Sequence, residues 1–416
     1  MSLDTEASNT EALRRISSAQ AFLVDVRRAG DVIPDLAKKE LLHAGPPLQD
    51  WHEACGALRG AVTGTLVHLD LARDLASAEE AVRSGAIVLS SANDRNALAT
   101  YGGVIGCDTP VLVVENRTGK TVACAALNEG RGRALRYGAN DAQTLARLAW
   151  LEGEFATVLS AALRLSGGID VFEILVQALH MGDDGHSRQK AASALLLNAV
   201  APWLLESGKE ARAIAGAVRF MAQNDIFFLP VTMAAAKSAL ASAEGIAGCT
   251  VVTCMCTNGA QFGIKVSGAP NRWCTAPLPA IHGRYVEGYR AEDANPVIGD
   301  SEIAETLGLG AFAMPAAPAL ARYVGGTPEE ATRLALAMYS ITLAEHARFT
   351  IPALSFRGTP FGIDARKVVA QGIEPLFNTG IAHREPGIGQ IGAGFGRAPL
   401  ACFRLALEAL EAGDPR

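Results

Sequence analysis

The sequence predicts a multi-domain α/β fold with an N-terminal layered α/β domain, a helical middle domain and a C-terminal mixed α+β domain. The chain has 416 residues, more than a single hydrophobic core normally organises. Apolar residues make up 49% of the chain and charged residues only 19%, as in compact proteins rather than disordered ones. Short apolar runs occur toward both ends, whereas the middle is rich in alanine and leucine at helical spacing.

The N-terminal domain, residues 1–140, is predicted from apolar runs that are separated by helical patterns. The segment 116–119 has the composition of a tight turn and should join two of these runs into a hairpin. Ser77 lies three residues before Glu80, the spacing of a capping box, which favours a helix start there. The expected strands are 21–26, 86–89, 110–115 and 121–127, and the expected helices are 51–70 and 77–84.

The middle domain, residues 141–245, should consist of helices, because its apolar residues recur at helical spacing between glycine-containing breaks. The C-terminal domain, residues 246–416, returns to short apolar runs that predict a small antiparallel sheet. The expected strands here are 250–256, 262–266, 273–275 and 376–382, and the expected helices are 302–307, 329–349 and 398–412. A glycine-rich loop should join the last strand to the last helix.

The charge balance and the apolar pattern exclude several classes of protein. The formal net charge is -6, whereas proteins that bind nucleic acids carry clustered Lys and Arg. The polar N-terminus lacks the apolar core of a signal peptide. No apolar run reaches the roughly 18 residues that a membrane span needs. We therefore expect a cytoplasmic protein with no nucleic-acid or membrane partner.

The sequence also gives little support for a metal or a cofactor. Cys254 and Cys256 would share one face of a strand, and Cys274 and His282 follow, but no second closely spaced cysteine pair completes a zinc motif. No Walker A loop, H-E-x-x-H or G-x-S-x-G motif is present. We expect buried thiols, no metal and no cofactor, so chemistry would rest on positioning and hydrogen-bond donors.

The glycine-rich segment 378–397 is the first candidate site. Its glycines match G-x-G-x-x-G, but only one helix follows, whereas a dinucleotide fold needs a further strand with an acidic residue. We expect instead a nest of backbone N–H groups for a small anion, with the positive end of the last helix nearby. His383 would handle protons near neutral pH. The expected substrate-binding residues are Asn378, Arg384, Gly387, Gly389, Gln390, Gly392 and Gly394. Tight packing is the alternative role of these glycines.

A second candidate is the turn that contains Asp183, Asp184, His186 and Arg188. We predict catalytic roles for Asp183 and His186 as an acid/base pair and a substrate-binding role for Arg188. The alternative is a helix cap made by either aspartate. Asp300 is a further substrate-binding candidate, although its position ahead of a helix also suits a cap.

Two polar corners follow predicted strands, where open α/β sheets often bind ligands. The first holds Glu115 and Asn116, and the second holds Asn128, Glu129 and Arg131. The amide, carboxylate and guanidinium of the second corner suit a planar carbamoyl group, whose donors and acceptors they match. We predict a catalytic role for Glu129 and substrate binding by the other four residues. Ordinary turns are the alternative at both corners.

Several stretches are similar to a known family, among them LLHAGPP, TPVLVVEN, LNEGRG, RYGA, ANPVIGDSEIAET, NTGIAH and GIGQIGAG. Read in order along nearly the whole chain, they resemble the YlbE-like family, which is associated with the large subunit of oxamate carbamoyltransferase. The resemblance implies a cytoplasmic subunit that works with co-encoded subunits in the catabolism of allantoin and other ureides. It implies transfer of a carbamoyl group between oxalurate and phosphate, which gives oxamate and carbamoyl phosphate.

On this resemblance the small anionic substrates would lie against the backbone of 387–396 and against Arg384. His383 would carry the proton, and Asn128 and Glu129 would align the carbamoyl group. We expect a hetero-oligomer, and also a homodimer, with no cofactor. The alternatives are an acyl-transfer enzyme that acts on another ureide or amide, and a non-catalytic scaffold subunit.

Overall fold

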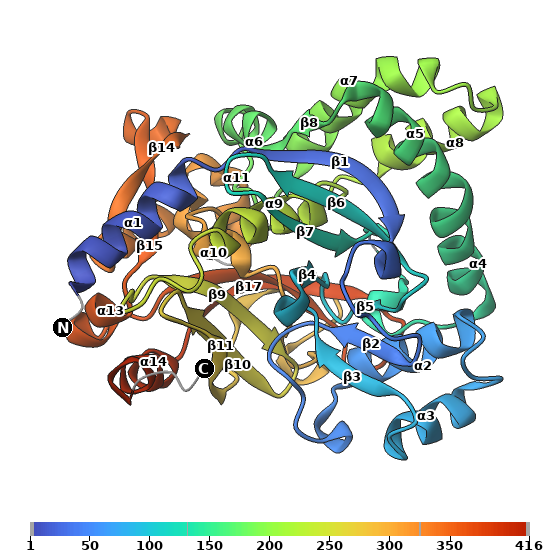
Figure 1. The fold of residues 1–416 in the computed structure, drawn as a ribbon, viewed down its shortest axis with the longest axis horizontal. Helices are drawn as coiled ribbons and strands as arrows, with labels where there is room; N and C mark the ends of the chain where they lie inside the picture. The colour runs from blue at the N-terminus through green and yellow to red at the C-terminus, as the bar shows by residue number, and fades with distance from the viewer. Residues whose placement is uncertain (1–3, 131, 324–325, 413–416) are drawn as a thin grey trace.

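Five β-sheets are present in the computed structural model, which describes residues 4–130, 132–323 and 326–412 (Figure 1). The largest sheet has the strand order β4-β7-β6-β1-β8. Its strands are β1 (Ala21–Arg28), β4 (Ala97–Leu98), β6 (Pro110–Asn116), β7 (Thr121–Ala126) and β8 (Ile169–Asp170). The β6-β7 hairpin is antiparallel with Asn116 opposite Thr121, which confirms the predicted turn. A multi-domain α/β fold is therefore confirmed.

A second sheet, of order β3-β2-β5, lies beside helices α2 and α3. Its strands are β2 (Glu40–His43), β3 (Val88–Ser91) and β5 (Val104–Ile105). The expected helix 51–70 is divided into a 3₁₀ turn (Trp51–Glu53) and α2 (Gly56–His68). Helix α3 (Leu75–Arg83) begins before Ser77, because Asp74 is the N-cap and Ser77 is its reciprocal capping-box partner. The predicted start of α3 at Ser77 is thus wrong.

The middle of the chain is helical, as predicted, except for the two-residue strand β8. A π-helix (Leu151–Phe155) separates two of the helices. The helices are α4 (Ala142–Trp150), α5 (Ala156–Ser166), α6 (Val171–His180), α7 (Lys190–Glu206), α8 (Ala211–Gln223) and α9 (Leu229–Ala241). Helix α9 packs on β6 and β7, and one apolar core contains Leu23, Phe228 and Phe349 from all three predicted domains. The boundaries at 140 and 245 stay a prediction.

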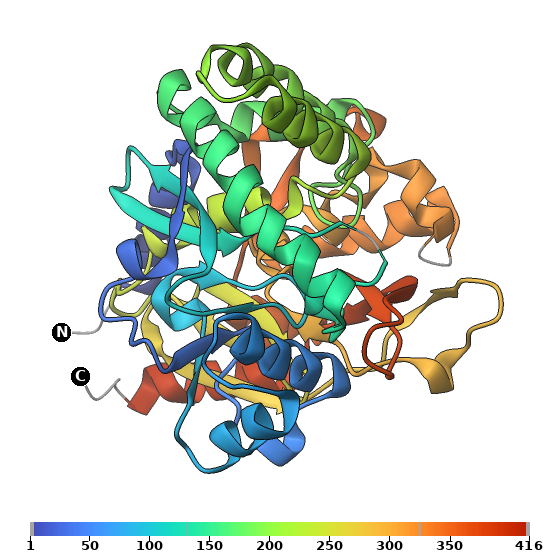
Figure 2. The same cartoon turned by 90° about the vertical axis from the view of Figure 1, so that its right-hand side faces the viewer.

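The C-terminal third contains the remaining three sheets, of order β11-β10-β9-β13, β12-β17-β16 and β14-β15. Their strands are β9 (Val252–Asn258), β10 (Gln261–Val266), β11 (Ala269–Pro277), β12 (His282–Tyr285), β13 (Ile298–Gly299), β14 (Thr342–Ile351), β15 (Arg357–Ile363), β16 (Leu376–Ala382) and β17 (Gln390–Arg397). The helices are α10 (Ile303–Thr306), α11 (Pro318–Tyr323), α12 (Pro328–Met338), α13 (Ala365–Gln371) and α14 (Leu400–Ala412). The segment that carries β12 projects from the body (Figure 2).

The predicted helix 329–349 is wrong beyond Met338. Residues 342–351 instead form β14, which pairs antiparallel with β15 from Thr342 opposite Ile363 to Ile351 opposite Arg357. The segment has Thr or Ile at three of its ten positions, and such β-branched residues fit a pleated, half-buried surface. The conformation of residues 342–351 is therefore determined by pairing with β15, which follows in the chain, and not by the local helical spacing.

The expected glycine loop is also shorter than predicted, because β17 begins at Gln390. Gly392 and Gly394 lie in this central strand, between β16 and β12. A Cβ atom on Gly392 would lie 2.4 Å from the carbonyl oxygen of Arg284, and one on Gly394 would lie 2.4 Å from that of His282. Both glycines therefore allow close strand packing, which was the alternative role. The whole of β17 lies between the turn at 383–389 and α14 along the chain.

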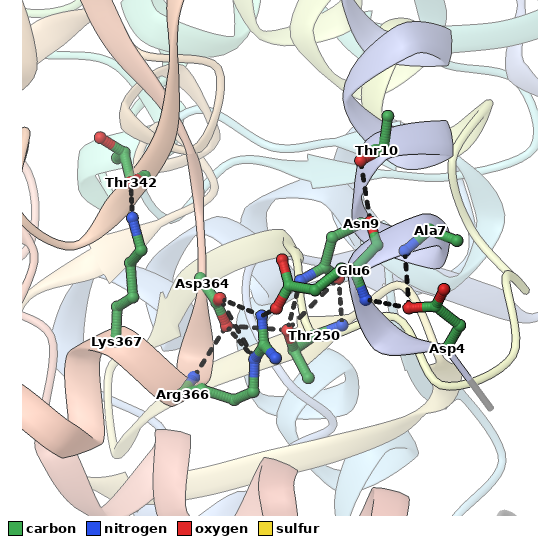
Figure 3. A network of polar contacts seen from close by, with 10 residues as sticks. All are labelled: Asp4, Glu6, Ala7, Asn9, Thr10, Thr250, Thr342, Asp364, Arg366 and Lys367. Carbon is green, nitrogen blue, oxygen red and sulfur yellow. Dashed lines mark hydrogen bonds and ion pairs between the residues drawn. The ribbon is translucent and has the colours of Figure 1, made fainter. Parts of the chain in front are cut away.

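Helix α1 (Thr5–Ser17) ties the start of the chain to its last third (Figure 3). Arg366 contacts both Asp364 and Glu6 at 2.8 Å. Thr250 donates a hydrogen bond of 2.7 Å to Asp364 and accepts one of 2.9 Å from Asn9. Asp364 also caps α13 by accepting the backbone N–H of Arg366. Within the described ranges, no helix is long and apolar enough to cross a membrane.

Candidate functional site

A cavity is lined by residues from all three predicted domains. We call it the central cavity; its volume is about 60 Å3. It is lined by Thr100, Tyr101, Arg136, Tyr137, His186, Ser187, Ile226, Leu229, Ser301, Thr379, Gly380, Gln390 and Ala393. His186 and Gln390 were predicted site residues. A larger cavity, of about 500 Å3, lies between β12 and α12 and is lined by none of the predicted site residues.

His186 forms a buried ion pair with Glu305, which the sequence analysis did not identify. Nδ1 of His186 lies 2.8 and 2.9 Å from the two carboxylate oxygens of Glu305. Burial lowers the pKa of His186, but attraction to Glu305, together with its hydrogen bond, outweighs burial and raises the pKa to about 9. His186 is therefore a cation at neutral pH. Because Nδ1 is held by Glu305, Nε2 is the ring nitrogen left for a ligand.

The pair is held by backbone and amide donors from three segments. The Glu305 carboxylate also accepts N–H bonds from Ala311 at 2.9 Å and from Asn378 at 3.0 Å. The side-chain amide of Asn378 donates to Asp184 at 2.9 Å, and Asp184 accepts the backbone N–H of His186 at 3.0 Å. Asn378, in β16, thus links the two carboxylates that set the position of His186. Its side-chain oxygen has no hydrogen-bond partner within the described part of the chain.

Asp183 contacts the first turn of α7 and the side chain of Arg188. One carboxylate oxygen of Asp183 accepts the N–H of Ala192 at 2.9 Å, and the other lies 3.5 Å from Nε of Arg188. Burial raises the pKa of Asp183 to about 7. Arg188 lies in a separate surface pocket with Lys190. The carboxylate partner of the His186 imidazole is Glu305 and not Asp183, which was predicted to form an acid/base pair with it.

Arg136 is a cavity residue that the sequence analysis missed. Its side chain is 3% exposed, and its guanidinium lies 4.5 Å from the ring centroid of Tyr137. Nη2 donates to the carbonyl of Gly130 at 2.5 Å. Nε and Nη1 have no hydrogen-bond partner among the described residues. The signal that could have found Arg136 is the RYGA stretch, which the resemblance included only as a motif.

The corner of Asn128 and Glu129 positions Arg136. The Glu129 carboxylate accepts the N–H of Leu135 at 2.8 Å and that of Arg136 at 3.2 Å. Asn128 accepts the N–H of Gly130 at 2.9 Å, and its amide nitrogen has no partner in the described ranges. Glu129 lines a neighbouring cavity that shares Thr100 and Arg136 with the central one. The predicted residue Arg131 lies outside the described residues.

Three predicted residues do not line the central cavity. Glu115 is exposed on β6. Asn116 closes the β6-β7 turn by accepting N–H bonds from Gln20 at 3.1 Å and Gly119 at 3.0 Å. Asp300 is buried and accepts an N–H bond of 2.8 Å from Gly45 and another of 2.8 Å from Ala99. Burial raises the pKa of Asp300 to about 7. Asn116 and Asp300 thus join segments of the chain.

The turn after β16 also lies outside the central cavity. Nδ1 of His383 accepts the backbone N–H of Glu385 at 2.9 Å, and its ring meets Tyr289 edge to face. Arg384 is exposed. Gly387 and Gly389 have φ values of +88° and +98°, a region that favours glycine, so they shape the turn. Gln390, the first residue of β17, is the member of this segment that reaches the central cavity.

The cysteine pair lies apart from this chemistry. The sulfur atoms of Cys254 and Cys256 are 3.6 Å apart on β9, and both side chains are buried. Burial raises the pKa of the Cys256 thiol well above its ordinary value. In the part of the chain that the structure describes, no three His, Cys, Asp or Glu side chains form a group that could hold a metal ion.

The fold and this cavity define a multi-domain α/β protein with a cavity lined by His186 and Arg136, and comparison with known proteins identifies its family. The chain belongs to the family of the oxamate carbamoyltransferase subunit AllG, whose model matches residues 87–301. It is 42% identical to the oxamate carbamoyltransferase subunit AllG of Escherichia coli K12, over 97% of both chains. The resemblance seen in the sequence is therefore confirmed.

Two further proteins are similar over most of their length. The uncharacterized protein YahG of Escherichia coli K12 is 41% identical over 96% of this chain and 85% of its own. A crystal structure of a conserved protein of unknown function from Enterococcus faecalis V583 matches with a TM-score of 0.96 and 41% identity, over 98% of both chains. The fold is therefore shared with a solved structure as well as with AllG.

Proposed function

We propose that this chain is a subunit of a cytoplasmic carbamoyltransferase that moves a carbamoyl group between oxalurate and phosphate in ureide and allantoin catabolism. Membership of the AllG family supports the reaction class. The observation that carries the site is a cavity with two buried cations, His186 and Arg136, and no Asp or Glu among its lining residues. Phosphate, oxalurate and oxamate are all anions, so such a cavity suits each of them. The co-encoded subunits, with a second copy of this chain, complete the enzyme.

In this proposal a phosphate oxygen forms a bond to the carbamoyl carbon of oxalurate. The bond from that carbon to the oxamate nitrogen breaks, and the nitrogen takes up a proton. His186 supplies the proton from Nε2, because its pKa near 9 keeps it charged at neutral pH. Arg136 attracts the negative charge of the substrates. Asn378, Asp184 and Glu305 position His186 through the contacts described above.

The test is phosphate-dependent cleavage of oxalurate, followed as carbamoyl phosphate formation with and without the co-encoded partner proteins. We expect His186→Gln to reduce kcat by about a hundredfold or more, the range for loss of a general acid. His383→Ala is the matched comparison, because that histidine lies outside the cavity and should leave kcat nearly unchanged. The site assignment is wrong if His383→Ala abolishes turnover while His186→Gln does not. The reaction assignment is wrong if the folded complex forms no carbamoyl phosphate.

A related ureide or amide is the second candidate substrate. The chain is nearly as similar to uncharacterized YahG, at 41% identity, as to AllG, at 42%, so sequence similarity does not select the acceptor. Replacing oxalurate by other N-carbamoyl compounds in the same assay distinguishes the two candidates. Phosphorolysis of another compound at a higher kcat/KM than that of oxalurate would favour the second.

A further inference from the structure

Three buried basic side chains among the described residues are each paired with a carboxylate, and Arg136 is not. Lys237 and Lys265, 1% and 5% exposed, form ion pairs with Glu244 and Asp94. His186 is paired with Glu305. Arg136 is as buried as these three, yet none of the described carboxylates lies within ion-pair distance of its guanidinium.

Arg136 stays protonated, and therefore charged, despite its burial. A buried histidine or lysine loses its proton when burial is not compensated, and burial does lower the pKa of His346, to about 3. An arginine keeps its charge at any physiological pH. An unpaired charge inside a protein costs free energy. Its presence in a buried site therefore indicates that an anion from outside the chain binds there.

The nearest acidic groups are already engaged. Both oxygens of Glu129 accept backbone N–H groups from the turn that contains Arg136. Glu152, across the neighbouring cavity, contacts Nε2 of His68 at 2.5 Å. Glu305 holds His186. None of these carboxylates lies within ion-pair distance of the Arg136 guanidinium in the described chain.

The central cavity provides the remaining features of an oxyanion site. Its lining adds six hydroxyl-bearing side chains to the two cations: Thr100, Tyr101, Tyr137, Ser187, Ser301 and Thr379. Hydroxyls and cations can all donate hydrogen bonds, and charge-assisted bonds to phosphate or carboxylate oxygens are the strongest of this kind. Nε and Nη1 of Arg136 are the unused donors with formal charge.

We propose that Arg136, with His186, forms an oxyanion subsite in the central cavity, which binds inorganic phosphate or a small carboxylate such as oxamate. The identity of the anion as a substrate rests on the proposed function. The existence of the subsite does not, because it follows from the unpaired guanidinium and the donors around it. The subsite requires only this chain, so it can be measured without turnover and without partner proteins.

The experiment measures anion binding to the full chain by calorimetry and by the shift of its melting temperature. Phosphate and oxamate are added in separate arms, with chloride at matched ionic strength as the reference. We expect saturable binding of at least one anion and a rise in Tm. Arg136→Met should weaken that binding by about tenfold to a hundredfold, the range for hydrogen bonds to a charged group. Its Tm without anion should not fall, because an uncompensated cation has been removed.

Arg117→Met is the matched control. Arg117 also lies over an aromatic ring, at 3.7 Å from the centroid of Phe22, and also donates from Nη2 to a backbone carbonyl, at 2.5 Å from Gly167. It is exposed and does not line the cavity, so its loss should leave anion binding unchanged. Arg136→Lys keeps the charge and should retain part of the affinity, even if Arg136→Met does not fold.

The outcomes separate this inference from the proposed function. Binding that depends on Arg136, without any phosphorolysis of oxalurate, supports the subsite and rejects the reaction. Turnover by the complex together with equal anion binding by wild type and Arg136→Met supports the reaction and overturns the subsite. Absence of binding of both anions to the wild-type chain also overturns the subsite, as does undiminished binding by Arg136→Lys when Arg136→Met does not fold.

Discussion

The His186–Glu305 pair gives the most direct stability prediction, through Glu305→Gln. Glu305 is fully buried and accepts hydrogen bonds from the His186 ring and from the backbone of Ala311 and Asn378. Glutamine has nearly the same shape but no charge, and only one of its two terminal atoms accepts hydrogen bonds. The substitution therefore removes the ion pair with little change in packing.

The magnitude follows from the pKa of His186. Glu305 raises this pKa to about 9 against the effect of burial, from an ordinary value of 6.5. Without the carboxylate the pKa should fall to 6.5 or below, and at about 1.36 kcal/mol per unit the pair contributes roughly 3 kcal/mol. Because the folded pKa lies above the unfolded one, the contribution is complete below pH 6.5 and is lost as the pH rises through 9. Breaking a buried pair costs about 3–5 kcal/mol, a range with the same lower end.

The assay is urea unfolding of wild type and Glu305→Gln, at pH 6 and at pH 10. We expect a loss of about 3 kcal/mol at pH 6 and a much smaller loss at pH 10. Glu345→Gln is the control, because Glu345 forms an exposed ion pair with Arg357, and such pairs contribute about 0–1 kcal/mol. A loss below about 1 kcal/mol at pH 6, or one that is independent of pH, would refute the reasoning about His186.

Three further predictions concern glycines and a buried carboxylate. Gly310 has φ +60°, and a Cβ atom there would lie 2.1 Å from a carboxylate oxygen of Glu305. Gly310→Ala should therefore lower the free energy of unfolding in urea by about 2 kcal/mol or more. Gly153→Ala is the control, because a Cβ atom at Gly153 would have no neighbour within 4 Å. Gly394→Ala should increase amide hydrogen exchange in β12, because the added Cβ atom would lie 2.4 Å from the carbonyl oxygen of His282, and it should leave anion binding unchanged. Weaker anion binding with unchanged hydrogen exchange would instead indicate that Gly394 binds the ligand. Burial raises the pKa of Glu302 to about 8 from 4.5, so wild type should lose stability as the pH rises from about 4.5 through 8, whereas the melting temperature of Glu302→Gln should vary less over that range.

Elements that depend on local pattern could be predicted from the sequence. The strands of the β6-β7 hairpin and of the β9-β10-β11 sheet are neighbours along the chain and are joined by short turns. Their sequences show either alternating apolar and polar residues or continuous apolar runs, which are local signals of a strand. The segment 342–351 could not be predicted in this way. Its spacing also suits a helix, and what decides its conformation is pairing with β15, which no local window contains.

The site was only partly predictable, because its most informative property is burial. The turn at His186 and the strand at Asn378 were identified from clustered polar residues and from resemblance. Glu305 lies 119 positions from His186, and nothing in the local sequence indicates that the two meet. Arg136 belongs to the RYGA stretch of the resemblance, but only the structure shows that it is buried with no carboxylate among the described residues within ion-pair distance. Glycine density indicated a ligand nest, but in β17 two of these glycines serve strand packing.

The central cavity is lined by all three predicted domains, so a ligand bound there would link their stabilities. Arg136 lies in the predicted N-terminal domain, His186 in the helical domain and Thr379 in the C-terminal domain. A ligand that contacts all three binds only when the three segments are folded together. Binding to the folded state alone stabilises it by about 2.7 kcal/mol at a hundred times the Kd. That stabilisation should appear in the unfolding of all three segments at once, because loss of any one of them destroys the site.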